Sequence, residues 1–146
     1  TLENVLDRDN ADALRRSVNE GRCVSLTGAV GTGKSWSAAA WLREHAHRGA
    51  SVAWLTSRFD GWDEVRRVAR ARAVVLDDAD LIHPDAVTMV VDAVRSVHGA
   101  ICITSNQAPS DLAVRLGERV VDRLRPVLSL SYHGKSLRGK PLEVPK

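Results

Sequence analysis

Short apolar runs rich in β-branched residues alternate along the chain with longer stretches of helical character. Strands are expected at residues 22–27, 51–56, 73–77, 100–104 and 127–131, each ending in Thr, Asp or Ser. Helices are expected at residues 10–20, 35–48, 62–71 and 84–98, with helical turns over 110–124 that Ser110 caps and Pro126 stops. Because the strand runs are apolar on both faces, the pattern predicts an α/β fold with a parallel sheet between two layers of helices.

The length of 146 residues is enough for one domain with a single folded core. We expect this core to span residues 1–131. Residues 132–146 contain three lysines, two glycines and two prolines, and are expected to form an irregular basic tail.

A glycine-rich segment directly after the first expected strand fits the pattern G-x-x-x-x-G-K-[ST] and opens a helix. The segment is Gly28, Ala29, Val30, Gly31, Thr32, Gly33, Lys34 and Ser35. Glycines let the backbone wrap closely around a phosphate, and the N-terminus of the helix adds partial positive charge. Lys34 is expected to contact the β- and γ-phosphates of ATP, and Ser35 to ligate Mg²⁺. The alternative, a chance glycine-rich turn, rarely has this strand-to-helix context.

Two carboxylates end the most apolar strand, at Asp77 and Asp78. Ligands of parallel sheets bind at this edge. Asp77 is expected to hold the shell of a Mg²⁺ ion, and Asp78 to orient or deprotonate an attacking water. Many ATPases of this kind have Glu in the second position, so the shorter Asp78 predicts slow turnover. The alternative is that both residues only cap the following turn.

The fourth strand also ends in small polar residues, and Thr104 or Asn106 could reach the γ-phosphate from there. Of the two, Asn106 is the preferred candidate. A polar turn without a function is the alternative.

Three arginines lie within seven residues of the last helical stretch. Arg119 and Arg123 are four residues apart and share a helix face, as residues supplied to the ATP of a neighbouring subunit would. The alternative is a solvated basic face with local pairs to Glu118 and Asp122.

The net charge is only +3, but 17 of the 21 basic residues are arginine, which binds phosphate in a bidentate manner. This favours contact with nucleic acid, although codon usage can produce the same bias. Two cysteines are too few for a disulfide scaffold or a four-thiolate zinc site. Without a leader or a long apolar run, the sequence predicts a cytoplasmic protein with no membrane contact. The tryptophans Trp36, Trp41 and Trp54 are expected to pack between helix and sheet, and the five histidines lack metal-site spacing.

The segments GAVGTGKS, VVLDD, ITSN, LGERVVDRLRP and HGKSLRG occur in one order over nearly the whole chain. In this order they resemble the DnaC/IstB-type helicase loaders and transposition ATPases of the AAA+ class, which are related to the DnaA initiator. The resemblance implies a P-loop (ASCE) sheet of order 5-1-4-3-2 without a separate helical lid domain. It also implies an ATP-dependent homo-oligomer that acts on single-stranded DNA and a replicative helicase. In it, Lys34, Ser35, Asp77 and Asp78 would act in cis, Asn106 as a sensor, and Arg119 or Arg123 in trans.

Two departures from the family pattern qualify this resemblance. A helicase-binding region ahead of the ATPase core is missing or lies outside these residues. Residues 57–72 are too short for the family's inserted helical pair, and retain Arg58, Phe59, Trp62, Arg66, Arg67 and Arg70. These side chains could stack on bases and bind phosphates, or form an exposed basic helix with Trp62 packed inward. The alternative functions are a transposition helper ATPase, a nucleotide-switched adaptor with little hydrolysis and, less favoured, a small-molecule kinase.

Overall fold

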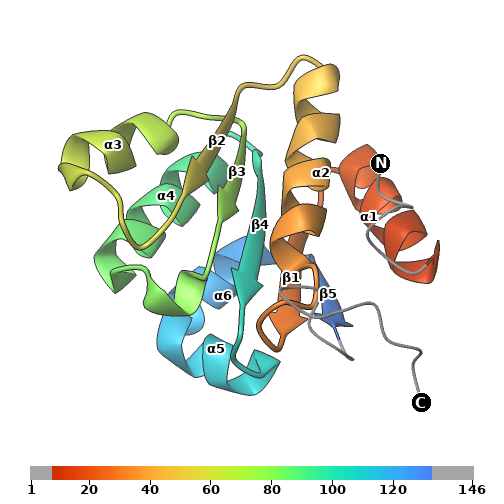
Figure 1. Ribbon diagram of the computed structural model, residues 1–146. Coiled ribbons are helices and arrows are strands. Elements are labelled where there is room, and N and C mark those ends of the chain that lie inside the picture. Colours follow the sequence, from red (N-terminus) through yellow and green to blue (C-terminus); the bar gives the residue numbers. More distant parts are fainter. Residues whose placement is uncertain (1–7, 133–146) are drawn as a thin grey trace.

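The five apolar runs form one parallel sheet in the computed structural model, which describes residues 8–132 (Figure 1). The strands are β1 (Cys23–Gly28), β2 (Val52–Leu55), β3 (Ala73–Leu76), β4 (Ala100–Ser105) and β5 (Val127–Tyr132). Their order is β2-β3-β4-β1-β5, and every neighbouring pair is parallel. The expected order 5-1-4-3-2 is the same sheet described from its other edge, so this prediction is confirmed.

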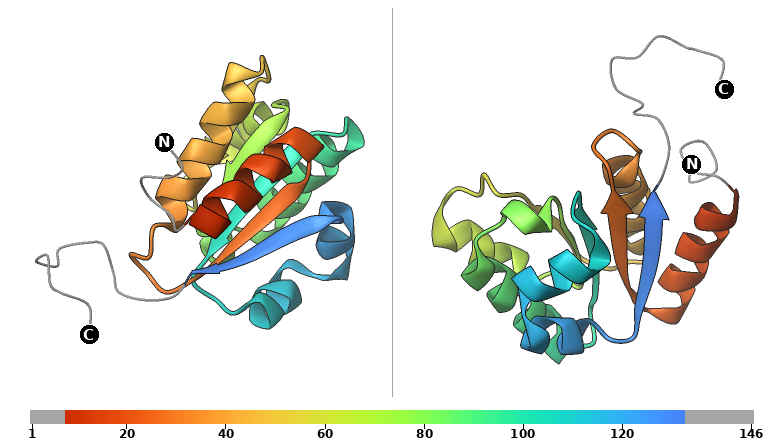
Figure 2. Two further views of the ribbon diagram at one scale, coloured as in Figure 1. Left: turned by 90° about the vertical axis from the view of Figure 1, so that its right-hand side faces the viewer. Right: turned by 90° about the horizontal axis from the view of Figure 1, so that it is seen from below.

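Helices cover both faces of the sheet, as the apolar strand pattern predicts. They are α1 (Arg8–Glu20), α2 (Lys34–His47), α3 (Gly61–Val68), α4 (Pro84–Ser96), α5 (Pro109–Leu116) and α6 (Glu118–Leu124), with a 3₁₀ turn, η2, at Ala79–Leu81. One core lies between the sheet and α1 and α2, and the other between the sheet and α3 to α6 (Figure 2). The three-layer α/β architecture is therefore confirmed. The described residues contain no separate helical lid domain.

Several local expectations need correction. Ser110 does not cap α5, because the helix begins one residue earlier, at Pro109, and Ala108 occupies the N-cap position without a side-chain bond. Trp41 is fully buried, but Trp36 is 69% exposed and does not pack between helix and sheet. Tyr132, assigned above to the tail, is the buried last residue of β5. The remaining tail, residues 133–146, and the expected core residues 1–7 lie outside the described part.

No helix within residues 8–132 has the length and apolar character needed to cross a bilayer.

Both cysteines lie in the cores, Cys23 on β1 and Cys102 on β4, and both are fully buried. Burial raises the pKa of each thiol above its ordinary value of 9.0. We expect neither thiol to react with a disulfide reagent at pH 8 in the native protein, and both to react in guanidinium chloride. In the unfolded chain the thiols ionise near pH 9, so the free energy of unfolding should also fall as the pH rises above this value. Rapid labelling of the native protein would contradict the buried placement.

Candidate active site

The glycine-rich loop joins the carboxyl end of β1 to the first turn of α2, and its backbone requires glycine at two close positions. Gly33 has φ 94° and precedes the first helical residue, where no side chain caps the helix. Gly28 has φ 145°, and a Cβ atom there would lie 2.2 Å from the carbonyl oxygen of Tyr132 on β5. The loop therefore leaves the N–H groups of the first helical turn without a side-chain cap, as a phosphate-binding loop requires.

The ammonium group of Lys34 is held inside this loop. Its Nζ donates hydrogen bonds to the carbonyl oxygens of Gly28 and Ala29, each at 2.7 Å, and the residue is only 6% exposed. The loop is braced by Thr32, whose Oγ1 donates to the Ala29 carbonyl at 2.8 Å. A buried cation beside uncapped helical N–H groups is a suitable site for phosphate oxygens.

Asp77 directly follows β3 and connects the glycine-rich loop to β4. Its Oδ1 accepts hydrogen bonds from Ser35 Oγ at 3.0 Å and from Thr104 Oγ1 at 2.7 Å. Thr104 is fully buried on β4, and its Oγ1 also accepts the backbone N–H of Asp78 at 2.8 Å. Thr104 was one of two candidates for contact with the γ-phosphate. In the structure Thr104 bonds to both aspartates and is absent from the cavity lining, whereas Asn106 lines the cavity.

Asp78 adopts an unusual backbone conformation directly after β3. Its φ and ψ are 51° and 54°, in the left-handed region that few non-glycine residues adopt. Asp and Asn tolerate this region better than longer side chains do, which gives a structural reason for a short side chain at this position. The next residues form η2, which the sequence pattern did not predict.

A cavity of about 220 Å³ brings the predicted cis residues together at the carboxyl edge of the sheet. It is lined by Val30, Gly31, Gly33, Lys34, Ser35, Trp36, Asp77, Asp78 and Asn106. Of the predicted loop residues, Gly28, Ala29 and Thr32 shape or brace the loop rather than line the cavity. The sequence did not predict the place of Trp36, which lies exposed at this cavity directly after Ser35.

The donor set of the cavity fits a Mg²⁺–triphosphate group. Ser35 Oγ and Asp77 Oδ1 are 3.0 Å apart and supply the oxygen ligands that Mg²⁺ prefers. The described residues contain no cluster of three or more His, Cys, Asp or Glu side chains that could hold a metal by themselves. This agrees with Mg²⁺, which usually binds to one or two protein groups and completes its shell with phosphate oxygens and water.

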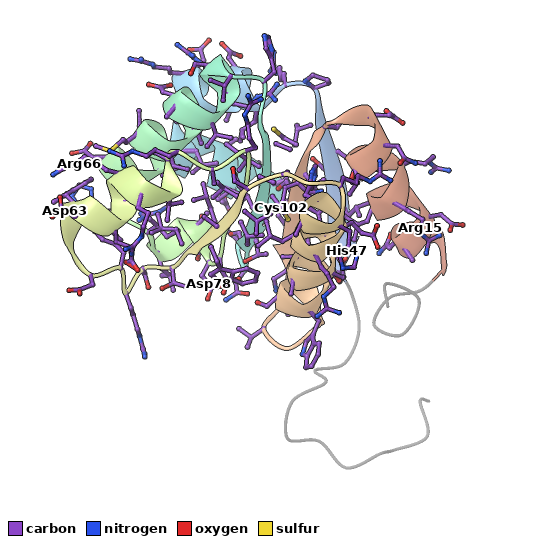
Figure 3. The ribbon with its side chains drawn as sticks, turned by 90° about the horizontal axis from the view of Figure 1, so that it is seen from above. Arg15, His47, Asp63, Arg66, Asp78 and Cys102 are labelled. Atoms are coloured by element: carbon purple, nitrogen blue, oxygen red, sulfur yellow. The ribbon has the colours of Figure 1, made fainter. Side chains whose placement is uncertain are left out.

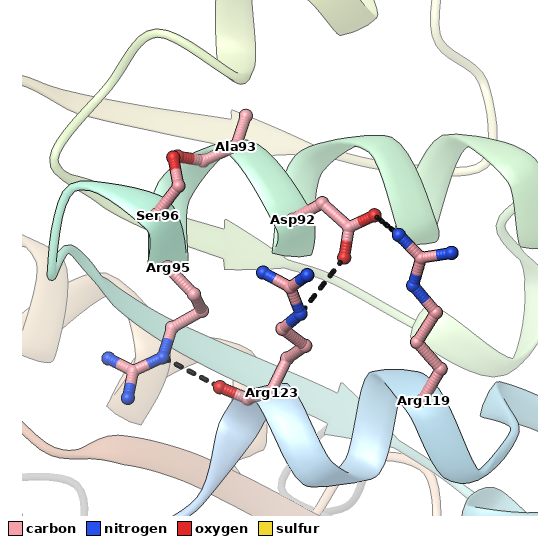
Figure 4. Close-up of polar contacts among 6 residues, drawn as sticks. All are labelled: Asp92, Ala93, Arg95, Ser96, Arg119 and Arg123. Atoms are coloured by element: carbon pink, nitrogen blue, oxygen red, sulfur yellow. Dashed lines mark hydrogen bonds and ion pairs between the residues drawn. The ribbon is translucent and has the colours of Figure 1, made fainter.

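The two predicted trans arginines lie outside this cavity, on α6. Arg119 Nη2 donates to Asp92 Oδ2 on α4 at 2.8 Å, and Arg123 Nε lies 3.6 Å from Asp92 Oδ1 (Figure 4). Of the local pairs suggested by the sequence, Asp122 pairs with Arg125 at 3.5 Å, whereas Arg119 and Arg123 contact Asp92 on the other helix. No arginine is among the described residues that line the cavity. The arginine side chains are 69% and 43% exposed, so they remain accessible to another molecule.

A second basic surface lies along α3 and the turn after it, where the side chains of Arg66, Arg67 and Arg70 are exposed. Figure 3 shows Arg66 and its partner Asp63, 3.0 Å apart, on the outer side of α3. Trp62 is 39% exposed and does not pack fully inward. Its ring contacts those of Phe59 and His83 edge to face, with centroids 5.6 and 5.7 Å apart.

Comparison with known proteins gives structural matches alone: no protein-family model and no curated protein sequence matches the chain. The replication initiator DnaA, solved with AMPPCP and single-stranded DNA, superposes with a TM-score of 0.71 at 16% identity, covering 92% of this chain and 50% of that one. AMPPCP-bound DnaA from Aquifex aeolicus gives 0.69 at 17%, covering 90% and 49%. The DnaC helicase loader gives 0.66 at 20%, covering 84% and 88%.

The chain spans about half the length of these DnaA structures. At such identities the likeness concerns the fold alone. The structure described here therefore shares the fold of these DnaA and DnaC structures.

Proposed function

We propose that the chain is the ATPase domain of a DNA replication helicase loader, which binds and hydrolyses ATP at interfaces between its copies. The observation that carries the proposal is the cavity that joins Lys34, Ser35, Asp77, Asp78 and Asn106, together with an exposed arginine pair on a different surface. The AAA+ fold shared with the DnaC helicase loader supports this proposal.

The loop and Lys34 would bind the phosphates of ATP. Their N–H groups and ammonium supply hydrogen-bond donors for phosphate oxygens, and Lys34 itself is only 6% exposed. Ser35 and Asp77 would hold Mg²⁺, which neutralises charge on the β- and γ-phosphate oxygens when it is bound. Thr104 would keep the Asp77 carboxylate in place through its 2.7 Å hydrogen bond.

Asp78 and Asn106 would act on the attacking water. Asp78 would orient this water or accept its proton, because the residue lines the cavity next to Asp77. Asn106 lies at the end of β4 and would contact the γ-phosphate as a sensor of its presence. Arg119 or Arg123 of a second copy would supply the guanidinium that the lining of the cavity lacks. Such an interface is heterologous and generates a ring or a spiral of copies.

The proposed partners are single-stranded DNA and a replicative helicase, in the cytoplasm. The basic and aromatic side chains along α3 are suited to phosphates and bases, respectively. The similarity to DnaC supports a helicase partner.

Replacing Arg66 and Arg70 with alanine is expected to weaken binding of single-stranded DNA about tenfold near 0.1 M salt. Two lost phosphate contacts should also reduce the slope of log K against log salt by about 1.4. Fluorescence anisotropy with a labelled oligonucleotide measures both. Arg15→Ala with Arg16→Ala is the matched control, because Arg15 forms the same kind of pair with Asp12 on α1, on the far side of the molecule (Figure 3). Unchanged affinity in the α3 variant would exclude this surface.

Sedimentation velocity with Mg²⁺ and AMPPCP, with and without single-stranded DNA, tests the proposal. We expect nucleotide-dependent oligomers that DNA strengthens, and their loss in Lys34→Met and Arg119→Ala. A monomer that binds nucleotide under every condition and does not hydrolyse ATP would favour a nucleotide-switched adaptor. The short carboxylate of Asp78 is the observation behind this second candidate. A transposition helper ATPase would share the assembly and differ in its partner protein.

A further inference from the structure

The two exposed arginines of α6 share one carboxylate from a different helix (Figure 4). Asp92 on α4 is the acidic partner of both Arg119 and Arg123, and its side chain is only 27% exposed. Arginines four residues apart on a helix repel each other, and their long side chains would otherwise sample many rotamers. A carboxylate between them reduces this repulsion and makes the two guanidinium groups converge.

The backbone of α6 is held by the same segment of α4. Arg95 lies one turn after Asp92, and its Nε donates to the carbonyl oxygen of Arg123 at 2.7 Å. Its other nitrogens donate to the carbonyl oxygens of Arg125 at 3.1 Å and Gly99 at 2.8 Å. α4 therefore fixes both the C-terminal end of α6 and the direction of its two arginine side chains.

The charge of this cluster remains positive, since one carboxylate faces two guanidinium groups. Each guanidinium carries five N–H donors, and the contact with Asp92 uses a single nitrogen of each. A phosphate could therefore bind to the arginines while Asp92 keeps its own contacts. This arrangement differs from a simple exposed ion pair, which would be neutral overall.

We propose that Asp92 is a positioning residue, which orients Arg119 and Arg123 toward the triphosphate bound by a second copy of the chain. The inference rests on the proposed function, in which these arginines act in trans. Asp92 itself touches no phosphate. It acts by reducing the number of orientations from which the arginines must reach the transferring group, and so affects turnover more than ATP binding.

The first test compares the steady-state kinetics of Asp92→Asn, Asp92→Glu and Asp122→Asn with wild type. We expect kcat of Asp92→Asn to fall about tenfold while KM for ATP stays within twofold, and Asp92→Glu to restore most of kcat. Asp122→Asn is the matched control, because Asp122 lies on α6 but pairs with Arg125. The melting temperature of Asp92→Asn should shift by no more than a few degrees, since both arginine partners are open to water and asparagine keeps the shape of aspartate.

The second test mixes Asp92→Asn in equal amounts with Asp78→Asn, a variant that is expected to lose hydrolysis but still to bind ATP and assemble. The first variant has an intact ATP cavity and the second an intact arginine face, so about a quarter of the interfaces should combine both. We expect the mixture to reach about a quarter of wild-type turnover, several times the mean of the two variants alone. Mixing that restores nothing would place the defect of Asp92→Asn in its own ATP cavity and overturn the inference.

Failure of the inference and failure of the proposed function give different results. If wild type hydrolyses ATP and loses activity on Arg119→Ala or Arg123→Ala, but Asp92→Asn keeps full kcat, the inference alone is wrong. If Asp92→Asn lowers the melting temperature strongly but leaves kcat per folded molecule unchanged, Asp92 has only a structural role and the inference is again wrong. If wild type neither assembles with AMPPCP nor hydrolyses ATP, the proposed function fails, and the role of Asp92 fails with it.

Discussion

Replacing Lys34 with methionine is expected to weaken the binding of Mg²⁺–AMPPCP at least about 100-fold, which corresponds to about 2.7 kcal/mol. Methionine keeps most of the apolar stem but removes the cation that lies within the glycine-rich loop. Lys34 is 6% exposed, so its charge is little screened by water and contributes strongly to a bound phosphate. It is also the only cation among the described residues that line the cavity.

Isothermal titration calorimetry measures the affinity directly. Arg43→Met is the matched control, because Arg43 is an exposed cation on the same helix and lies outside the cavity lining. Circular dichroism checks that the variant still folds, since the carbonyl oxygens of Gly28 and Ala29 lose their hydrogen-bond donor. A folded Lys34→Met protein that binds AMPPCP with wild-type affinity would show that the cavity is not the nucleotide site.

The elements of this fold could be predicted from the sequence because they depend on local patterns. Apolar runs, Gly49 after α2 and Pro84 at the start of α4 identify strands and helices within a few residues. The order of the strands in the sheet could not be predicted in this way, because hydrophobic periodicity does not specify which strands are neighbours. That order came from the family resemblance, and it agrees with the structure.

Within the site, the position of residues that are contiguous in sequence could be predicted from the sequence, whereas contacts between separate elements depend on the fold. The glycine-rich loop and the Asp77–Asp78 pair are each a continuous segment of the sequence, and residues of both segments line the cavity. The hydrogen bonds of Thr104 to Asp77 and Asp78 were not predicted. Once β3 and β4 are known to be neighbours, however, the register Leu76↔Ile103 places Asp77 beside Thr104. The sequence contained this signal only in combination with the sheet order.

Other residues gave no usable signal in the sequence. Asp92 lies 27 residues before Arg119 on a separate helix, so no local spacing indicates their contact. Trp36 has the residue type of a buried side chain, but it occupies the exposed side of the first turn of α2. The hydrophobicity of a residue predicts burial only on average, so the exposure of Trp36 could not be predicted from its residue type.

Replacing Asp78 with asparagine is expected to lower kcat for ATP hydrolysis roughly 10²- to 10³-fold while ATP binding stays within about threefold. Asparagine has the same shape and tolerates the left-handed backbone, so the substitution removes the negative charge without straining the turn. The phosphate-binding loop, Ser35 and Asp77 are unchanged, which is why binding should persist. Single-turnover hydrolysis with radiolabelled ATP separates the chemical step from binding and release.

Asp78→Glu tests whether backbone strain or the length of the side chain limits the turnover that a carboxylate at this position supports. Glutamate keeps the carboxylate, but the left-handed conformation should cost about 1 kcal/mol of folding stability. Turnover within tenfold of wild type in Asp78→Glu, with the loss in Asp78→Asn, would identify the carboxylate as the group that acts on water. Equal turnover in wild type and Asp78→Asn would mean that the charge has no part in hydrolysis. The short side chain of Asp78 would then serve only to permit the left-handed backbone at φ 51°, and the adaptor function would gain support.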